Sequence, residues 1–139
     1  MLIFFDTNIL LDIITQRSPH YASSQSVLDA CDALDADVVI AWHTLATTFY
    51  IVAKQEGRQK AAEILKATLT AMTVVETGQA AALRAFEPNF SDLEDAMQAA
   101  AAEVALADFI ITRDSLGFSK SPVPALTPKE FIARFSGHS

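Results

Sequence analysis

The sequence is short of the residues that build disulfide-stapled or zinc-binding proteins. It has one cysteine, Cys31, so it can form no disulfide framework and no zinc site made of several thiolates. Its three histidines, His20, His43 and His138, lie far apart along the chain, which argues against a zinc site in general. A metal ion bound by this protein must therefore be held by oxygen ligands.

Long hydrophobic runs and basic leader segments are also lacking. No basic residue precedes the apolar N-terminal segment, and Asp6 and Asp12 interrupt it, so this segment does not have the pattern of a signal peptide. No stretch reaches the ~18 consecutive apolar residues of a membrane span. We therefore expect a cytoplasmic protein.

An excess of positive charge is the third feature that the sequence lacks. The net charge of −7 is opposite to that of a protein that grips nucleic acid through a broad basic face. This charge could aid solubility, or it could come from a cluster of carboxylates that a divalent ion would partly neutralise, and composition leaves both alternatives open. The 51% hydrophobic content with four Gly and five Pro favours a compact fold, and we expect one domain spanning residues 1–139.

Short apolar segments alternate with segments of helical periodicity. This alternation predicts an α/β fold in which a mainly parallel central sheet lies between layers of helices. Ser91 is the expected N-cap of the helix that follows the break at Pro88. The expected strands are 2–5, 38–41, 73–75, 109–111 and a brief extended segment at 123–126, and the expected helices begin at 7, 21, 44, 58, 78, 92 and 127.

Four aspartates are predicted to meet at one edge of this sheet. Asp6 directly follows the first strand, and Asp114 lies just beyond the strand 109–111. Asp92 and Asp95 share one face of the first turn of the helix that leads into that strand. In open parallel sheets ligands bind at the carboxyl ends of the strands, which is where all four acids are expected.

Carboxylates held close together repel one another and raise one another's pKa, unless a cation lies among them. Several oxygen ligands suit Mg²⁺ or Mn²⁺, and such an ion can polarise a phosphodiester and activate water. Each acid also has a structural interpretation: Asp6 as a helix cap, Asp92 as a partner of the helix dipole, and Asp114 as a turn residue. Their joint placement favours the metal site.

Three stretches of the sequence resemble the PIN domain family, close to the VapC-type toxins of bacterial toxin–antitoxin pairs. They are FFDTNILLDI, DLEDAMQAAAAEVALADFIITRDSLGF and PVPALTPKEF. The resemblance covers nearly the whole chain. It implies a PIN-like, Rossmann-like three-layer sandwich and a divalent-metal-dependent endoribonuclease.

The resemblance also implies roles for particular residues. Asp6, Asp95 and Asp114 match the acids of the family's catalytic metal site, which would hold Mg²⁺ or Mn²⁺. Asn8 and Thr112 match the polar residues that support this site by hydrogen bonding.

The sequence departs from the family pattern at two positions. Most active relatives carry a glutamate in the helix after the second strand, where this chain has Thr48 or, in the alternative register, Thr47. Thr48 is therefore expected to be a supporting residue of the site, whose hydroxyl can at most hydrogen-bond a metal-bound water. Relatives often have an acid where this chain has Gly117. Asp92 matches an extra acid found in some members, as a further metal-site candidate.

Other notable side chains have ordinary structural interpretations. We expect Asp12 to lie on a solvated helix face. Arg113 could contact a phosphate, although a surface arginine beside two acids is the default. Trp42, Phe49 and Tyr50 could stack on bases, but packing in the core or in an interface is the favoured interpretation.

Two classes of function follow. The first is a metal-dependent ribonuclease that acts as the toxin of a type II toxin–antitoxin pair, with RNA as substrate, a cognate antitoxin as partner and a homodimeric state. The second, suggested by the missing glutamate, is a catalytically weak or inactive PIN-like module that binds RNA or protein.

Overall fold

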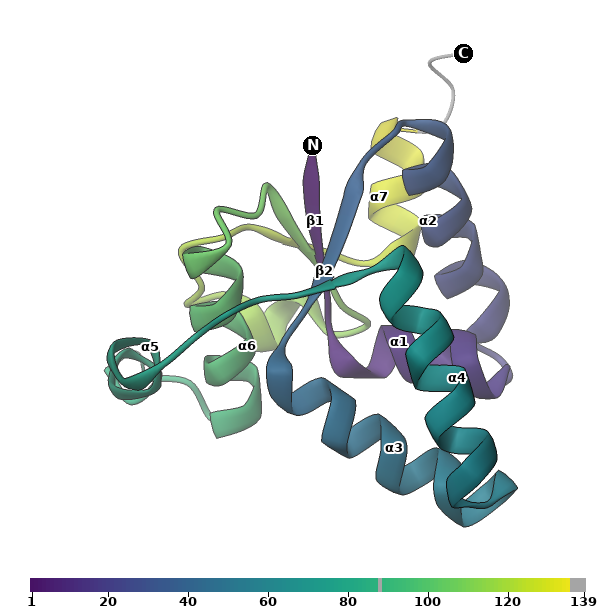
Figure 1. Cartoon of the computed structure of the whole chain (residues 1–139). Coiled ribbons are helices and arrows are strands. Elements are labelled where there is room, and N and C mark those ends of the chain that lie inside the picture. The colour runs from purple at the N-terminus through teal and green to yellow at the C-terminus, as the bar shows by residue number, and fades with distance from the viewer. Residues whose placement is uncertain (88, 136–139) are drawn as a thin grey trace.

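The computed structural model describes residues 1–87 and 89–135 of the chain (Figure 1). Pro88 and His138, which entered the sequence analysis, lie outside the described residues. In the part of the chain that is described, no helix has the length and apolar character needed to cross a membrane.

A five-stranded parallel sheet forms the centre of the molecule. Its strand order is β3-β2-β1-β4-β5, and every neighbouring pair is parallel. The chain moves from β1 to β2 on one side, and β4 later joins the other side of β1, so the order reverses at β1. Ligands bind at such a switch point. The strands are β1 (Leu2–Phe5), β2 (Asp37–Ile40), β3 (Thr73–Val74), β4 (Phe109–Ile111) and β5 (Ala125–Leu126).

Helices cover both faces of this sheet and complete three layers, as predicted (Figure 1). Helices α1, α2 and α7 cover one face, and α6 covers the other. The helices are α1 (Thr7–Thr15), α2 (Tyr21–Ala33), α3 (Trp42–Glu56), α4 (Arg58–Ala71), α5 (Gln79–Arg84), α6 (Leu93–Val104) and α7 (Pro128–Phe135), with a 3₁₀ helix, η1, at Ser115–Phe118.

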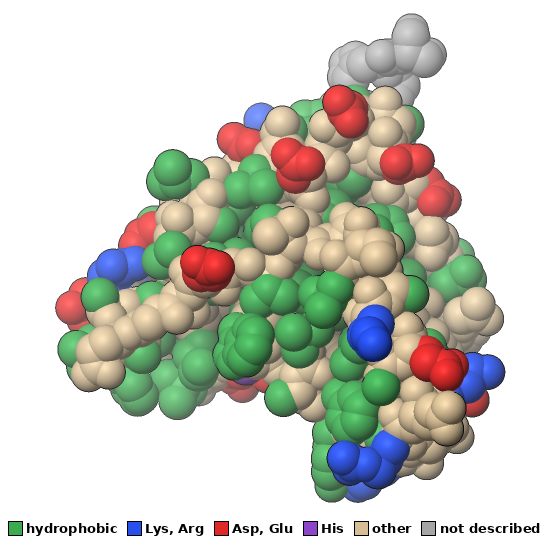
Figure 2. Space-filling model, viewed as in Figure 1, with side chains coloured by type: hydrophobic (Ala, Val, Ile, Leu, Met, Phe, Trp, Pro, Cys, Tyr) green, Lys and Arg blue, Asp and Glu red, His purple; other side chains and the backbone are tan. Residues whose placement is uncertain are grey.

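An apolar groove runs between α3 and α4. It has a volume of about 820 Å³, and Figure 2 shows hydrophobic side chains gathered on this side of the molecule with Lys and Arg side chains beside them. Trp42 is 70% exposed and Tyr50 62% exposed, and both line the groove. Packing in the core is therefore excluded for these two aromatic residues.

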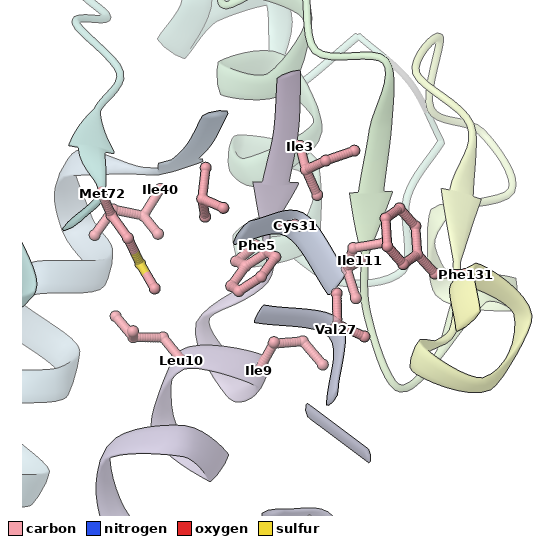
Figure 3. Packing of buried hydrophobic residues seen from close by; sticks show 11 residues of the cluster. Ile3, Phe5, Ile9, Leu10, Val27, Cys31, Ile40, Met72, Ile111 and Phe131 are labelled. Carbon is pink, nitrogen blue, oxygen red and sulfur yellow. The ribbon is translucent and has the colours of Figure 1, made fainter. Parts of the chain in front are cut away.

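The sheet divides the hydrophobic core into two clusters, and its central strand β1 is buried on both faces. Ile3 and Phe5 point to the side of α1, α2 and α7, where they pack with Ile111 and Phe131 (Figure 3). Phe4 points to the opposite side, where it belongs to a cluster that includes the α6 alanines Ala99, Ala101 and Ala102. Small alanine side chains allow this helix to lie close to the strands that carry the site.

Several local predictions were wrong in detail. The N-cap of α6 is Asp92, whose carboxylate accepts a hydrogen bond from the Asp95 N–H at 3.0 Å, and Ser91 precedes it. Asp12 is fully buried, since α2 packs over this end of α1. The 3₁₀ helix at Ser115–Phe118 was not predicted, because a single turn leaves no hydrophobic periodicity to detect.

Candidate active site

Asp6 lies at the carboxyl end of the central strand and is only 5% exposed. Its backbone N–H donates to the Ile111 carbonyl at 3.0 Å, which brings the ends of β1 and β4 together. One carboxylate oxygen, Oδ2, accepts from the Thr112 hydroxyl at 2.7 Å, and the other accepts from the Asn8 N–H at 3.3 Å. Asp6 therefore caps α1 and also presents a firmly held carboxylate at this edge.

A buried glutamine that the sequence analysis did not identify completes the support of Asp6. The Gln98 amide nitrogen donates to Asp6 Oδ1 at 3.1 Å, and its carbonyl oxygen accepts from the Thr7 N–H at 2.8 Å. The Thr7 hydroxyl in turn pairs with the Thr44 hydroxyl at 2.8 Å. Gln98 is the one long polar residue on an otherwise alanine-rich face of α6, and this signal could have revealed it.

The predicted acids line one pocket of about 340 Å³ at this edge of the sheet. Thr48 is not among its lining residues: it is fully buried on α3, and its hydroxyl has no partner in the described part of the chain. Glu94 lines the pocket although the sequence analysis did not select it. The lining consists of Asp6, Asn8, Asp92, Glu94, Asp95, Thr112, Arg113, Asp114 and Phe118.

Asp95 and Asp114 approach each other around Gly117. A Cβ atom at Gly117 would lie 3.0 Å from Asp114 Oδ2 and 3.2 Å from Asp95 Oδ2. The two carboxylate oxygens are therefore no farther apart than the sum of these distances. Asp114 also caps η1, because its Oδ1 accepts from the Gly117 N–H at 3.2 Å. The absence of a side chain at Gly117 leaves this space to the two carboxylates.

The electrostatic consequence is visible at Asp95. Burial, followed by the nearby carboxylates of Asp6, Asp92, Glu94 and Asp114, raises the pKa of its carboxyl group to about 6. Negative charge is thus concentrated in a partly desolvated space where each added charge is unfavourable. A cation placed there would relieve this repulsion.

The donor set fits a hard divalent ion, since it offers carboxylate oxygens and no thiolate. Among the described residues, no group of three or more His, Cys, Asp or Glu side chains is already arranged around one point to hold a metal ion. Mg²⁺ needs no such closed protein shell, because it usually retains several waters, through which some of the surrounding carboxylates can hold it. The open pocket is consistent with that mode of binding.

Helix α3 contributes no carboxylate to the pocket lining. One contact from this helix to a pocket residue is His43, whose Nε2 lies 3.7 Å from the Glu94 carboxylate, an ion pair when the imidazole is protonated. The glutamate that most active relatives carry in this helix is therefore not replaced by another carboxylate of α3 in the pocket lining.

Comparison with known proteins agrees with this architecture. Residues 2–116 match the model of the PIN domain family. The chain belongs to the PIN domain family. Ribonuclease VapC1 of Aquifex aeolicus (strain VF5) is 25% identical to this PIN domain, in an alignment that covers 96% of this chain and 95% of the relative. The predicted resemblance to VapC-type members is thereby confirmed.

Solved structures share the fold. A chain of VapBC2 from Rickettsia felis, solved bound to a DNA fragment from its promoter, has a TM-score of 0.71 at 18% identity, covering 91% of this chain and 98% of that chain. A chain of a toxin–antitoxin complex from Klebsiella pneumoniae has a TM-score of 0.69 at 24% identity, covering 91% and 97%. The three-layer PIN fold predicted from the sequence is confirmed.

Proposed function

We propose that this PIN domain is a divalent-metal-dependent endoribonuclease that hydrolyses RNA phosphodiester bonds. The observation that carries the proposal is the pocket at the switch point of the sheet, which Asp6, Asp95 and Asp114 line together. The Aquifex relative named as a ribonuclease supports the same activity. All five strands, which lie between residues 2 and 126, join a single sheet, and this supports one domain spanning residues 1–139.

In this proposal Asp6, Asp95 and Asp114 hold Mg²⁺ or Mn²⁺, with Asp92 as an additional candidate. The bound ion would supply Lewis-acid polarisation of the phosphodiester and would lower the pKa of the attacking water. Thr112 keeps the Asp6 carboxylate in place through its hydroxyl, and Asn8 does so through its backbone N–H.

Asparagine substitutions test the catalytic assignment. Asp6→Asn, Asp95→Asn and Asp114→Asn should each reduce metal-dependent cleavage of a single-stranded RNA by at least about 100-fold, while circular dichroism remains native. Asp92→Asn should have a smaller effect on cleavage. One Asp92 oxygen is already engaged with the Asp95 N–H in the α6 cap, and asparagine can keep that cap. Asp29→Asn, on the exposed side of α2, is the control. Equal loss of cleavage in this control would show that the catalytic residues do not lie in this pocket.

Thermal melting tests the metal assignment independently of cleavage. Millimolar Mn²⁺ should raise the Tm of the wild type, because the ion binds the folded pocket and not the unfolded chain. The Asp6→Asn/Asp95→Asn double variant should lose most of this shift. An equal shift in both proteins would contradict metal binding in this pocket.

The biological partner in this proposal is a cognate antitoxin, so that the protein is the toxin of a type II pair. Support comes from the matched Klebsiella pneumoniae structure, which is a toxin–antitoxin complex. An enzyme acting on cellular RNA would work in the cytoplasm, where the sequence analysis places it. Co-expression with the product of a small adjacent reading frame, followed by co-purification, would test the pairing.

The structure also favours a second candidate, a catalytically weak or inactive PIN-like module that binds RNA or protein. The specific observation is that α3 provides no carboxylate to the pocket, and that Gly117 replaces another acid of the family pattern. RNA binding without metal-dependent cleavage by the purified chain would favour this second function.

A further inference from the structure

Asp12 is a fully buried carboxylate that the proposed chemistry does not use. Its Oδ1 lies 3.0 Å from Arg17 Nε, and its Oδ2 lies 3.2 Å from Arg113 Nε. The Ser24 hydroxyl also donates to Oδ2, at 3.1 Å. A buried carboxylate is strongly unfavourable without partners. Here Arg17 Nε and the Ser24 hydroxyl donate hydrogen bonds to it, and Arg113 Nε lies within ion-pair distance without completing a hydrogen bond. We call Asp12, Arg17 and Arg113 the arginine pair cluster.

This cluster is joined to the acidic pocket at two points. Arg113 itself lines the pocket, next to Asp114 in the chain. Arg17 Nη2 donates to the side-chain oxygen of Asn8 at 3.2 Å and approaches its backbone carbonyl at 3.4 Å, and Asn8 also lines the pocket. Asn8 and Asp12 are four residues apart on α1 and share one face of the helix. The arginine pair cluster therefore forms one wall of the active-site region.

Among the described residues that line this pocket, Arg113 is the only arginine or lysine, yet its ion pair is not with a pocket acid. In the described part of the chain its salt bridge is to Asp12, and none is formed with Asp6, Asp95 or Asp114. If Arg113 served only to neutralise the pocket, it would be expected to pair with one of those acids. Its Nε makes an ion-pair contact with Asp12 without completing a hydrogen bond, and the two Nη groups remain for another anion.

The charge of the cluster supports the same conclusion. One carboxylate and two guanidinium groups leave a net positive charge, although one cation would suffice to neutralise Asp12. The Arg17 and Arg113 side chains are 37% and 31% exposed, so solvent and ligands can reach them. Although the chain has a net charge of −7, these two arginines form a positively charged region beside the negatively charged pocket. A polyanion entering the pocket needs such a contact to offset repulsion by the acids.

We propose that Arg113, oriented by Asp12 and accompanied by Arg17, binds a backbone phosphate of the RNA substrate next to the scissile bond. This inference rests on the proposed ribonuclease function. Guanidinium groups bind phosphate through paired, charge-assisted hydrogen bonds, which a fixed orientation strengthens. Arg113 is a substrate-binding residue in this assignment, and Asp12 is a positioning residue that acts through Arg113.

The test measures binding of a fluorescent single-stranded RNA in EDTA, where cleavage is absent, over a series of KCl concentrations. Arg113→Gln should weaken binding about tenfold and reduce the slope of log K against log salt by about 0.7, the value for one lost phosphate contact on a single strand. Arg113→Lys should retain the slope and recover only part of the affinity, because lysine keeps the charge but not the planar fork.

A matched control separates this site from general electrostatics. Arg84→Gln makes the same charge change on the partly exposed Arg84–Glu103 pair, away from the pocket lining. Equal effects of Arg84→Gln and Arg113→Gln would overturn the inference. With Mg²⁺ added, Arg113→Gln should raise KM more than it lowers kcat, whereas a structural defect would also lower the Tm.

Asp12→Asn gives a second test, in which general electrostatics and loss of positioning predict opposite changes in RNA affinity. It makes the protein less negative, so general electrostatics predicts tighter RNA binding, whereas loss of positioning predicts weaker binding. If this variant fails to fold, the Arg113 variants still decide the question. A wild type that binds RNA with no change in the Arg113 variants overturns only this inference. A wild type that neither binds nor cleaves RNA overturns the proposed function together with it.

Discussion

At the scale of the single residue, Asp95 makes the acidic pocket sensitive to pH. Its pKa is raised to about 6 by burial and then by the neighbouring carboxylates, while the unfolded chain has a value of about 3.9. The folded state thus binds this proton more tightly than the unfolded state does. The stabilising contribution is fully present below pH ~3.9 and is lost as the pH rises through about 6.

We therefore predict that Asp95→Asn stabilises the protein in EDTA at pH 7.5 and has less effect at pH 5. The physical reason is that an amide removes a charge that is unfavourable only when ionised. Thermal melts of both proteins across this pH range measure the effect. Parallel pH profiles for wild type and variant would show that the Asp95 charge does not control stability.

Gln98 provides a second residue-scale prediction. Gln98→Leu would leave Asp6 Oδ1 and the Thr7 N–H without their buried partner, and we expect a loss of about 3 kcal/mol in the free energy of unfolding. Urea denaturation measures this loss. Gln25→Leu is the control, because the Gln25 amide bonds, within the described part of the chain, to Asp29 alone on an exposed surface. Similar losses in both variants would refute a special role for the Gln98 network.

At the scale of the element, the rotation of α3 decides whether the missing family glutamate can be restored. Thr48 is fully buried and outside the pocket, so Thr48→Glu would bury an unpaired charge. Thr47 is half-buried and lies one turn after His43, whose imidazole faces Glu94 of the pocket.

We predict that Thr48→Glu lowers stability by several kcal/mol without improving metal binding. Thr47→Glu should tighten Mn²⁺ binding by about tenfold, equivalent to ~1.4 kcal/mol. Calorimetric titration with Mn²⁺ and melts in EDTA measure both quantities. Tighter binding in Thr48→Glu alone would place the helix in the other register, and no response in either variant would mean that α3 does not face the ion.

At the scale of the whole molecule, the groove between α3 and α4 leaves large aromatic side chains in solvent. We propose a homodimer in which a second copy covers this groove, since Trp42 and Tyr50 are far more exposed than such residues usually are. The family resemblance implies the same state.

Light scattering at micromolar concentration should therefore report twice the mass of the 15.0 kDa chain. Trp42→Ser/Tyr50→Ser should shift the protein towards monomer while leaving the Tm of the monomer nearly unchanged, because neither side chain is part of the core. Leu116→Ser, at a side chain that is 83% exposed outside the groove, is the control. A wild-type monomer whose double variant no longer retains the antitoxin would instead assign the groove to that partner.

The sequence alone determined the layered fold and the edge of the sheet at which the acids meet. The strand segments are short and continuously apolar, which is typical of strands covered on both faces, and parallel strands carry residues that follow them to a common edge. Asp6 and Asp114 could be placed together for this reason, since each directly follows a strand of that kind. The roles of these acids in metal binding stay a prediction.

Only the tertiary structure decided which side chains touch across this edge. Gln98 of α6 bonds to Asp6, which is 92 residues away in the sequence, and Arg113 pairs with Asp12 of α1, the helix on the other face of the sheet. Both contacts depend on helix rotation and strand register. A local pattern gives the periodicity of a helix but not its rotation against its neighbours to within one residue. Asp12 therefore looked solvated, Thr48 looked like a pocket residue, and the arginine pair cluster had no signal until the chain was folded.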